Sequence, residues 1–240
     1  MLLPEEDHAR IEQAVREAEA RTSGEIVCVV AEEASDYSEV PLIWAAAIAL
    51  ATPSLPLIFL SLVITVRQTF QGWDATLWIS APALVKDVAV LAVVQIALFT
   101  LVALLALIPD VRRFLTPHGL KQRYVRERAL EQFRGKQLAE TADHAAILLY
   151  VSLKDRCAEL IADEGIDVKV APGRWRSIVR QLAREIKKGH AASGFVSAIN
   201  ECGGLLAYHF PARDPNPNEL RDSVIELPLG SSPHAKSQEP

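Results

Sequence analysis

The hydrophobic pattern divides this chain into charged segments and two long apolar stretches. Residues 41–66 and 88–108 are stretches of 26 and 21 residues that contain no Asp, Glu, Lys or Arg. A helix needs about 20 apolar residues to cross a bilayer. We therefore expect two transmembrane helices, with residues 67–87 as the connecting loop.

The first apolar stretch has a second interpretation. Pro53 and Pro56 lie near its middle, and each proline removes a helical N–H donor and kinks or breaks a helix. A re-entrant hairpin is therefore the alternative to a kinked span. Trp44, Trp73 and Trp78 lie close to the span ends or in the loop, where we expect them to anchor at the membrane interface.

The N-terminal segment, residues 1–40, predicts one helix and one strand. Apolar residues at helical spacing indicate an amphipathic helix over 4–21, and the β-branched run at 25–31 indicates a mostly buried strand. A helix and a single strand cannot bury their apolar faces alone. We therefore expect residues 1–40 and 109–211 to form one domain, into which the membrane hairpin is inserted.

The second part of that domain predicts three helices and two strands. Residues 154–155 supply a turn, so the two strands are expected to pair as an antiparallel hairpin. The resulting fold class is α/β, with a small mixed β-sheet flanked by helices. Residues 212–240, which are rich in proline, are expected to form a flexible tail. The elements expected in chain order are a helix at 120–141, strands at 146–152 and 157–163, a short extended piece at 168–170, a helix around 175–186 and a helix at 193–208.

Charge and cysteine usage predict the location of the protein. The formal net charge is −5, and no segment is basic enough to indicate nucleic-acid binding. Arg112 and Arg113 begin a basic region after the second stretch, whereas the loop between the stretches has only Arg67 and Lys86. The positive-inside rule therefore predicts cytoplasmic termini. The acidic N-terminus is unlike a signal peptide, and three scattered cysteines fit a reducing compartment.

The apolar stretches also limit the function that they can perform. Gln95 is the most polar side chain in the pair of stretches, whereas ion pathways and proton relays need ionisable groups within the membrane. A channel or transporter subunit is therefore disfavoured unless the hairpin oligomerises. We expect the chemistry to reside in the soluble parts.

As an ordered set, the residues of the soluble parts resemble the TPM-domain family. The resemblance covers about 1–32 and 112–211. It is carried by Thr22-Ser23-Gly24-Glu25-Ile26, Arg128-Ala129 with Phe133, Leu138 and Thr141, Ile147–Ser152 with Arg156, Ile161-Ala162-Asp163, Gly165-Ile166, Trp175 with Ile178-Val179, Gly189, Gly194 and His209-Phe210-Pro211.

This resemblance implies a TPM-like fold and two possible properties. Phosphatase activity and calcium binding are described for some members of the family. Secreted members often carry an Asp- and Gly-rich loop after the first strand, but residues 32–39 contain no glycine and lead directly into the first apolar stretch. The chain therefore resembles the membrane-inserted bacterial subgroup, which implies the bacterial inner (plasma) membrane as its location.

Carboxylates after the second strand of the hairpin are the candidate metal ligands. Asp163, Glu164 and Asp167 cluster at a turn, and Asp143 precedes the first strand of the hairpin. Oxygen ligands of this kind bind Ca²⁺ or Mg²⁺, and the resemblance places Asp163 at the family's hairpin aspartate. Thr22, Ser23 and Glu25 would lie near these acids if the first strand is central. The alternative is that these are ordinary turn acids.

Asp143 and His144 form a second candidate, because histidine titrates near neutrality and the two could act as an acid/base pair. A helix cap or an exposed turn is the alternative account of this pair.

Basic residues on the 175–186 helix and just beyond it are the candidate membrane-surface or partner contacts. They can meet anionic lipid headgroups, and a solvated helix face is the alternative. The residues are Arg176, Arg180, Arg184, Lys187 and Lys188.

These features predict a membrane-bound binding or accessory module that binds Ca²⁺ or Mg²⁺ and has an unknown protein partner. The alternative is a metal-dependent phosphatase that uses Asp163 and its neighbours. The sequence contains no nucleophile elbow, phosphate-binding glycine loop or HExxH motif. Catalytic residues therefore stay unassigned, and an enzyme would have to rely on a metal and carboxylates.

Overall fold

The computed structural model describes residues 2–35, 37, 40, 43–48, 51, 81–105, 108–136, 138, 143–213 and 222–228. The chain divides into two compact units. One unit is formed by Met1–Ser35 together with His118–Pro240, and the other by Asp36–Pro117. The first unit is therefore built from both ends of the chain.

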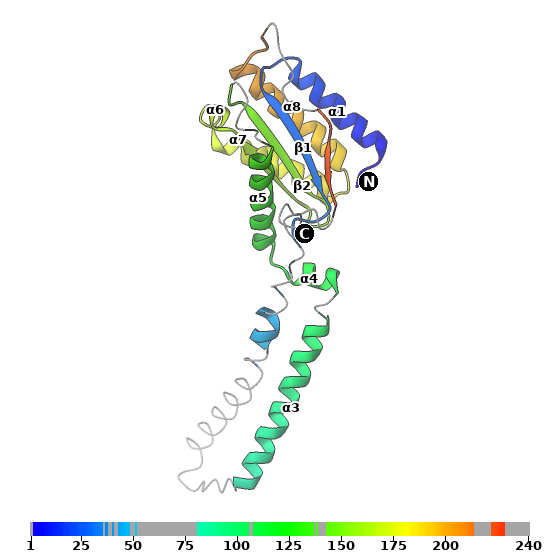
Figure 1. Ribbon diagram of the computed structural model, residues 1–240, viewed down its shortest axis with the longest axis vertical. Coiled ribbons are helices and arrows are strands. Elements are labelled where there is room, and N and C mark those ends of the chain that lie inside the picture. The colour runs from blue at the N-terminus through cyan, green and yellow to red at the C-terminus, as the bar shows by residue number, and fades with distance from the viewer. Residues whose placement is uncertain are drawn as a thin grey trace, which may run out of the picture. The chain divides into compact units, whose positions relative to one another are not determined.

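The first unit contains a four-stranded mixed sheet in the order β3-β2-β1-β4 (Figure 1). The central pair, β1 and β2, is parallel, and β1 also pairs in parallel with β4, whereas β2 and β3 are antiparallel. The α/β class and the mixed sheet are thus confirmed. The strands are β1 (Glu25–Ala31), β2 (Ala146–Ser152), β3 (Cys157–Ala162) and β4 (Ile225–Leu227).

Helices cover both faces of this sheet. Side chains of β1 and β2 alternate between two apolar clusters, and all seven residues of each strand are buried. Central strands buried on both faces read as continuous apolar runs rather than as alternating ones. One face packs against α1 (Glu5–Glu19), α7 (Pro172–Lys187) and α8 (Ala191–His209), and the other against α5 (His118–Gly135).

A short helix replaces one predicted element. Residues 168–170 were expected to be extended, but they form turns after α6 (Glu164–Asp167). Asp163 caps α6, because its carboxylate accepts a hydrogen bond from the backbone N–H of Glu164 at 2.8 Å. Pro172 then starts α7, as its fixed φ favours the first helical turn. Only four residues, 168–171, therefore separate α6 from α7, and they contain no strand.

The described part of the predicted tail, residues 222–228, is ordered against the sheet. It contains β4, which the sequence did not predict because three residues carry no periodic signal. The Glu226 carboxylate accepts hydrogen bonds from the backbone N–H groups of Leu2 and Leu3 at 2.7 and 3.0 Å. It also lies 2.7 Å from Nε2 of His8. These contacts tie β4 to the N-terminus.

The second unit contains α3 (Ala81–Leu105) and α4 (Pro109–Leu115). The helix α3 has 25 residues and begins at Ala81, so the predicted loop at 67–87 extends too far at its C-terminal end. Most of the 41–66 stretch, including Pro53 and Pro56, lies outside the described residues, as do Trp73 and Trp78. Trp44 donates its indole N–H to the carbonyl of Leu115 at 3.1 Å.

Within the described residues, no single helix meets the length and hydropathy expected of a membrane span. A bent pair, Ala92–Leu105 and Pro109–Leu115, meets these criteria together, with an angle of 106° between the two helices.

The close packing of Gly165 yields a first prediction. A Cβ atom at Gly165 would lie 2.4 Å from the carbonyl oxygen of His144, which is backbone and cannot swing away. We expect Gly165→Ala to lower the free energy of unfolding by about 1–3 kcal/mol through overpacking. Chemical denaturation measures this change. Gly119→Ala, in a helix with nothing within 4 Å, is the control and should be neutral or stabilising. Equal stabilities of the two variants would contradict the prediction.

Candidate functional site

Polar residues gather where β1 and β2 begin and β3 ends. We call Ser23, Asp143, His144 and Asp163 the sheet-end cluster. Ser23 donates its hydroxyl to Oδ2 of Asp143 at 2.7 Å, and Arg213 donates to Oδ1 at 2.6 Å. The expectation that Ser23 lies near the predicted acids is confirmed, because the central position of β1 places it beside the start of β2.

Asp163 is the most buried acid of this cluster, with a relative accessibility of 7%. Its Oδ1 atom caps α6, and its Oδ2 atom is buried without a hydrogen-bond partner among the described residues. Nδ1 of His144 lies 3.5 Å from Oδ2, close enough for an ion pair when the histidine is protonated. His144 has a positive φ of 50°, so its backbone adopts a conformation that few side chains favour.

The predicted metal ligands are dispersed over two places. Asp143 and Asp163 belong to the sheet-end cluster, whereas Asp167 lines a separate groove and Glu164 is exposed. Within the described ranges, no three His, Cys, Asp or Glu residues are arranged to hold a metal ion. Divalent-cation binding by these residues stays a prediction.

A partly buried carboxyl, that of Glu19, lies at the start of β1. Oε1 of Glu19 accepts a hydrogen bond from the backbone N–H of Ile26 at 2.8 Å, which joins α1 to the sheet. Burial, with a smaller contribution from the neighbouring carboxylates of Glu25 and Asp222, raises the pKa of Glu19 to about 8, against the lowering effect of the Ile26 hydrogen bond. Glu19 is therefore largely protonated at neutral pH.

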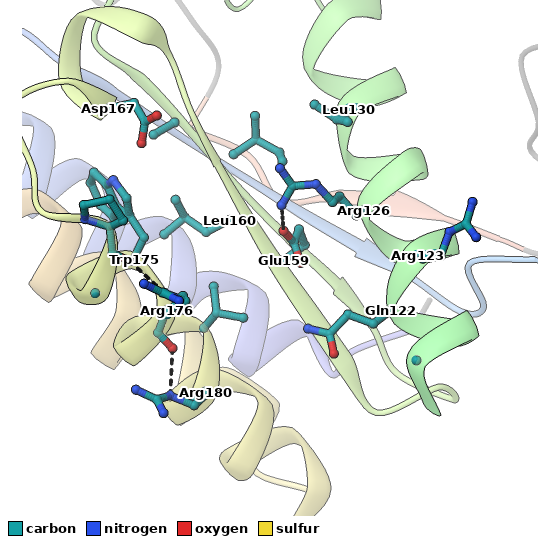
Figure 2. A pocket seen from close by; sticks show the side chains of 16 residues that line it. Gln122, Arg123, Arg126, Leu130, Glu159, Leu160, Asp167, Trp175, Arg176 and Arg180 are labelled. Carbon is teal, nitrogen blue, oxygen red and sulfur yellow. Dashed lines mark hydrogen bonds and ion pairs between the residues drawn. The ribbon is translucent and has the colours of Figure 1, made fainter. Parts of the chain in front are cut away.

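A large groove lies along β3, the edge strand on the other side of the sheet from β4. It has a volume of about 1060 Å³ and is lined by α5, β3, Asp167 of α6 and α7. Arg123 and Arg126 come from α5 and Arg176 and Arg180 from α7 (Figure 2). We call this feature the arginine groove.

The arginine groove carries excess positive charge. Arg126 pairs with Glu159 of β3 at 2.8 Å, and burial raises the pKa of Glu159 against the effect of Arg126. Arg176 and Arg180 direct their Nε–H groups to backbone carbonyls of their own helix, and neither has a carboxylate partner in the described chain. Arg123 lies 3.8 Å from the exposed Glu127.

Comparison with known proteins identifies the domain that holds these sites. Residues 112–205 match the model of the TPM domain. The chain contains a TPM domain. A solved structure, the BA42 protein from the psychrophilic bacterium Bizionia argentinensis, has a similar fold with a TM-score of 0.53 and 17% identity over 95% of this chain and 97% of that one. No curated protein sequence matches.

The structure separates the predicted basic face of the TPM domain into two parts. Arg176 and Arg180 line the arginine groove, whereas Arg184, Lys187 and Lys188 do not. Lys188 instead pairs with Glu185 at 2.7 Å. The sequence did not indicate the α5 arginines or Glu159 as site residues. In the sequence they look like ordinary solvent-exposed charges, and only the structure shows that α5 and α7 flank one edge strand.

The cysteines of the TPM domain do not offer a nucleophile. Cys28, Cys157 and Cys202 are buried and free, as predicted. Burial raises the pKa of all three thiols, to about 11 for Cys157. The thiols are therefore protonated at neutral pH, and only the thiolate reacts readily.

The raised pKa of Glu19 yields a second prediction. A folded pKa of about 8 lies above the ordinary value of 4.5, so the folded state binds more protons between these values. Stability must then fall as pH rises from 4.5 to 8 and level off above 8. We expect Glu19→Gln to weaken this dependence and to stabilise the protein most at pH 8, where wild type contains a buried charge.

Urea denaturation at pH 5, 6, 7 and 8 measures the Glu19 effect. Glu17→Gln, an exposed substitution on the same helix, is the control and should leave the pH profile unchanged. Parallel profiles for wild type and Glu19→Gln would contradict the assignment.

Proposed function

We propose that this protein is an integral membrane protein of the bacterial inner membrane that presents its TPM domain at the membrane surface as a binding or accessory module. The observation that carries the membrane part is the exposure of α3. Of the α3 residues whose side chains are described, none is buried. The large exposed apolar side chains are Val90, Val93, Val94, Ile96, Phe99, Leu101, Leu104 and Leu105, with 39–66% accessibility.

These exposed side chains favour lipid as the neighbour of α3. At 100° per residue, six of these eight side chains fall within an arc of about 120°, and the rest of the circumference carries Ile96, Leu98, Phe99 and Val102, so the helix has apolar side chains on every side. A helix that is apolar all round requires an apolar surrounding, either a large core or a bilayer. Thr100 donates its hydroxyl to the carbonyl of Ile96 at 2.8 Å, so its polar group is satisfied within the helix.

The proposed orientation places both termini in the cytoplasm. Arg112 and Arg113 lie in α4 directly after the second apolar stretch. Basic residues close to a span favour the cytoplasmic side. A reporter enzyme that is active only in the cytoplasm is expected to be active when fused after Pro240. Activity of a periplasm-specific reporter at the same position would overturn the orientation.

Charge introduced into α3 yields a third prediction. Each Asp at the centre of a spanning helix costs about 2.5–3.5 kcal/mol, so we expect Ile96→Asp with Leu101→Asp to move the protein out of the membrane fraction. Alkaline carbonate extraction followed by immunoblotting measures this shift. Tyr208→Asp, at a side chain of the TPM domain that is 81% exposed, is the control and should leave membrane retention unchanged. Wild type that is fully extracted would overturn membrane insertion.

The binding role is supported by the arginine groove. It provides volume, apolar walls and uncompensated positive charge, which are features of recognition sites.

The sheet-end cluster supports a second candidate, a phosphatase assisted by Ca²⁺ or Mg²⁺. In it, the buried Oδ2 atom of Asp163 lacks a hydrogen-bond donor and lies beside His144.

Substitution of Asp163 yields a fourth prediction, which separates the two roles. As a binding module, the protein is expected to release no phosphate from p-nitrophenyl phosphate with Mg²⁺ or Ca²⁺, in wild type or in Asp163→Asn. Calorimetric cation titration of both proteins accompanies the assay. Glu6→Gln, an exposed substitution on α1 outside the predicted metal ligands, is the control. Turnover and cation binding that are lost only in Asp163→Asn would establish the phosphatase instead.

A further inference from the structure

The edge strand β3 directs part of its backbone into the arginine groove. The backbone N–H of Asp163 donates to the carbonyl of Ala146 at 2.9 Å, directly across the register that pairs β3 with β2. In an antiparallel pair, hydrogen-bonded and non-hydrogen-bonded residue pairs alternate. The N–H and C=O groups of Leu160 and Ala162 therefore point away from β2, toward the open edge.

These edge groups have no other partner in the described part of the chain. Among the described residues, no hydrogen bond joins the backbone of Leu160 or Ala162 to a residue outside the sheet. Both residues line the arginine groove. An edge strand of this kind is a template for pairing with another extended chain.

The side chains that line the groove determine which kind of extended chain can bind there. Because α5 and α7 pack on opposite faces of the sheet, their arginines flank the edge of β3 from both sides. An added strand presents alternate side chains to the two faces. Acidic side chains at these positions would meet Arg176 and Arg180 on one side and Arg123 on the other. Trp175, Leu160 and Val179 offer apolar surface between them.

We propose that the arginine groove binds an extended acidic segment of a partner protein, which adds to β3 as a fifth strand of the sheet. This inference rests on the proposed binding role of the TPM domain but not on its membrane attachment. Strand addition explains both features of the groove, since the backbone provides affinity and the side-chain positions provide specificity. A phosphate-bearing lipid would satisfy the arginines but would leave the alternating edge groups of β3 unmatched.

Peptide selection on the purified full chain tests this inference, in phosphatidylcholine nanodiscs or, if the chain does not insert into lipid, in buffer. Random dodecapeptides displayed on phage are expected to enrich for acidic residues alternating with β-branched or aromatic ones. The most enriched peptide is then synthesised, and its affinity is measured by fluorescence anisotropy. The triple variant Arg123→Ser, Arg176→Ser, Arg180→Ser should bind it about tenfold more weakly or worse, as charge pairs across an interface are lost.

A matched control removes the same charge elsewhere. The variant Arg10→Ser, Arg16→Ser, Arg134→Ser changes three exposed arginines outside the groove and should bind the peptide as wild type does. Arg126 is retained in both variants, because removing it would leave the nearly buried Glu159 without its partner.

Amide hydrogen exchange distinguishes strand addition from other binding modes. The peptide should slow exchange of the Leu160 and Ala162 amides, while the Ile161 amide, already directed toward Leu148, should be unaffected. A peptide methylated on alternate backbone nitrogens should lose binding. Binding without protection of these two amides would overturn the proposed geometry.

The remaining outcomes also decide the question. Absence of acidic enrichment, or equal binding by the groove and control variants, would overturn the proposal and leave the arginines as protection of a sheet edge. Binding to phosphatidylglycerol vesicles that only the groove variant loses, without peptide enrichment, would assign the groove to lipid. Retention of each variant in the membrane fraction is measured separately, so failure of the groove is distinguishable from failure of the membrane anchor.

Discussion

The parallel pairing of β1 with β2 is the constraint on which the rest of the first unit depends. It joins residues 25–31 to 146–152 without a break in register, and both strands are buried along their whole length. The entropic cost of closing a flexible loop rises by only about 0.6 kcal/mol for each doubling of its length. A whole unit, Asp36–Pro117, can therefore be inserted in the sequence between two strands that pair with each other.

The same pairing gives the two edges of the sheet different characters. With β1 and β2 central, β4 and β3 form the edges. At β4 the strand is only three residues long and is held to the N-terminus by Glu226. At β3 the flanking helices leave a groove whose walls are basic. Short strands and charged side chains both limit uncontrolled edge pairing, but only the β3 edge combines charge with space for a ligand.

The sequence predicts those elements whose burial requires a regular spacing of apolar residues. The β-branched runs of β1 and β2 and the apolar face of α7 are of this kind, and all three match the structure closely. The elements that depend on single contacts are not predicted from the sequence. Strand β4 is held by the carboxylate of Glu226, and α6 starts from the cap of Asp163, neither of which produces periodicity.

The candidate sites follow the same division. The proximity of Ser23 to Asp143 follows from a central β1, which could be reasoned from the sequence. The arginine groove could not be predicted from the sequence, because α5 and α7 are far apart in the chain. Their arginines line one groove only because the two helices pack on opposite faces of the sheet beside β3. Likewise, Asp167 is near Asp163 in sequence but lines the groove, since Asp163 caps the start of α6 and Asp167 lies at its other end.

In the proposed function, two helices with opposite surface chemistry, α7 and α3, separate recognition from membrane attachment. Helix α7 buries one stripe, Trp175, Ile178, Leu182 and Ile186, and exposes arginines. Each Arg would cost about 2.5–3.5 kcal/mol at the centre of a bilayer, whereas each Val, Leu, Ile or Phe of α3 would contribute about 0.3–0.6 kcal/mol in favour of insertion. The first helix therefore requires water on one side, and the second requires an apolar surrounding. In the proposed membrane-bound form, the bilayer surrounds the α3 segment without using any surface of the sheet, so the arginine groove can remain in water.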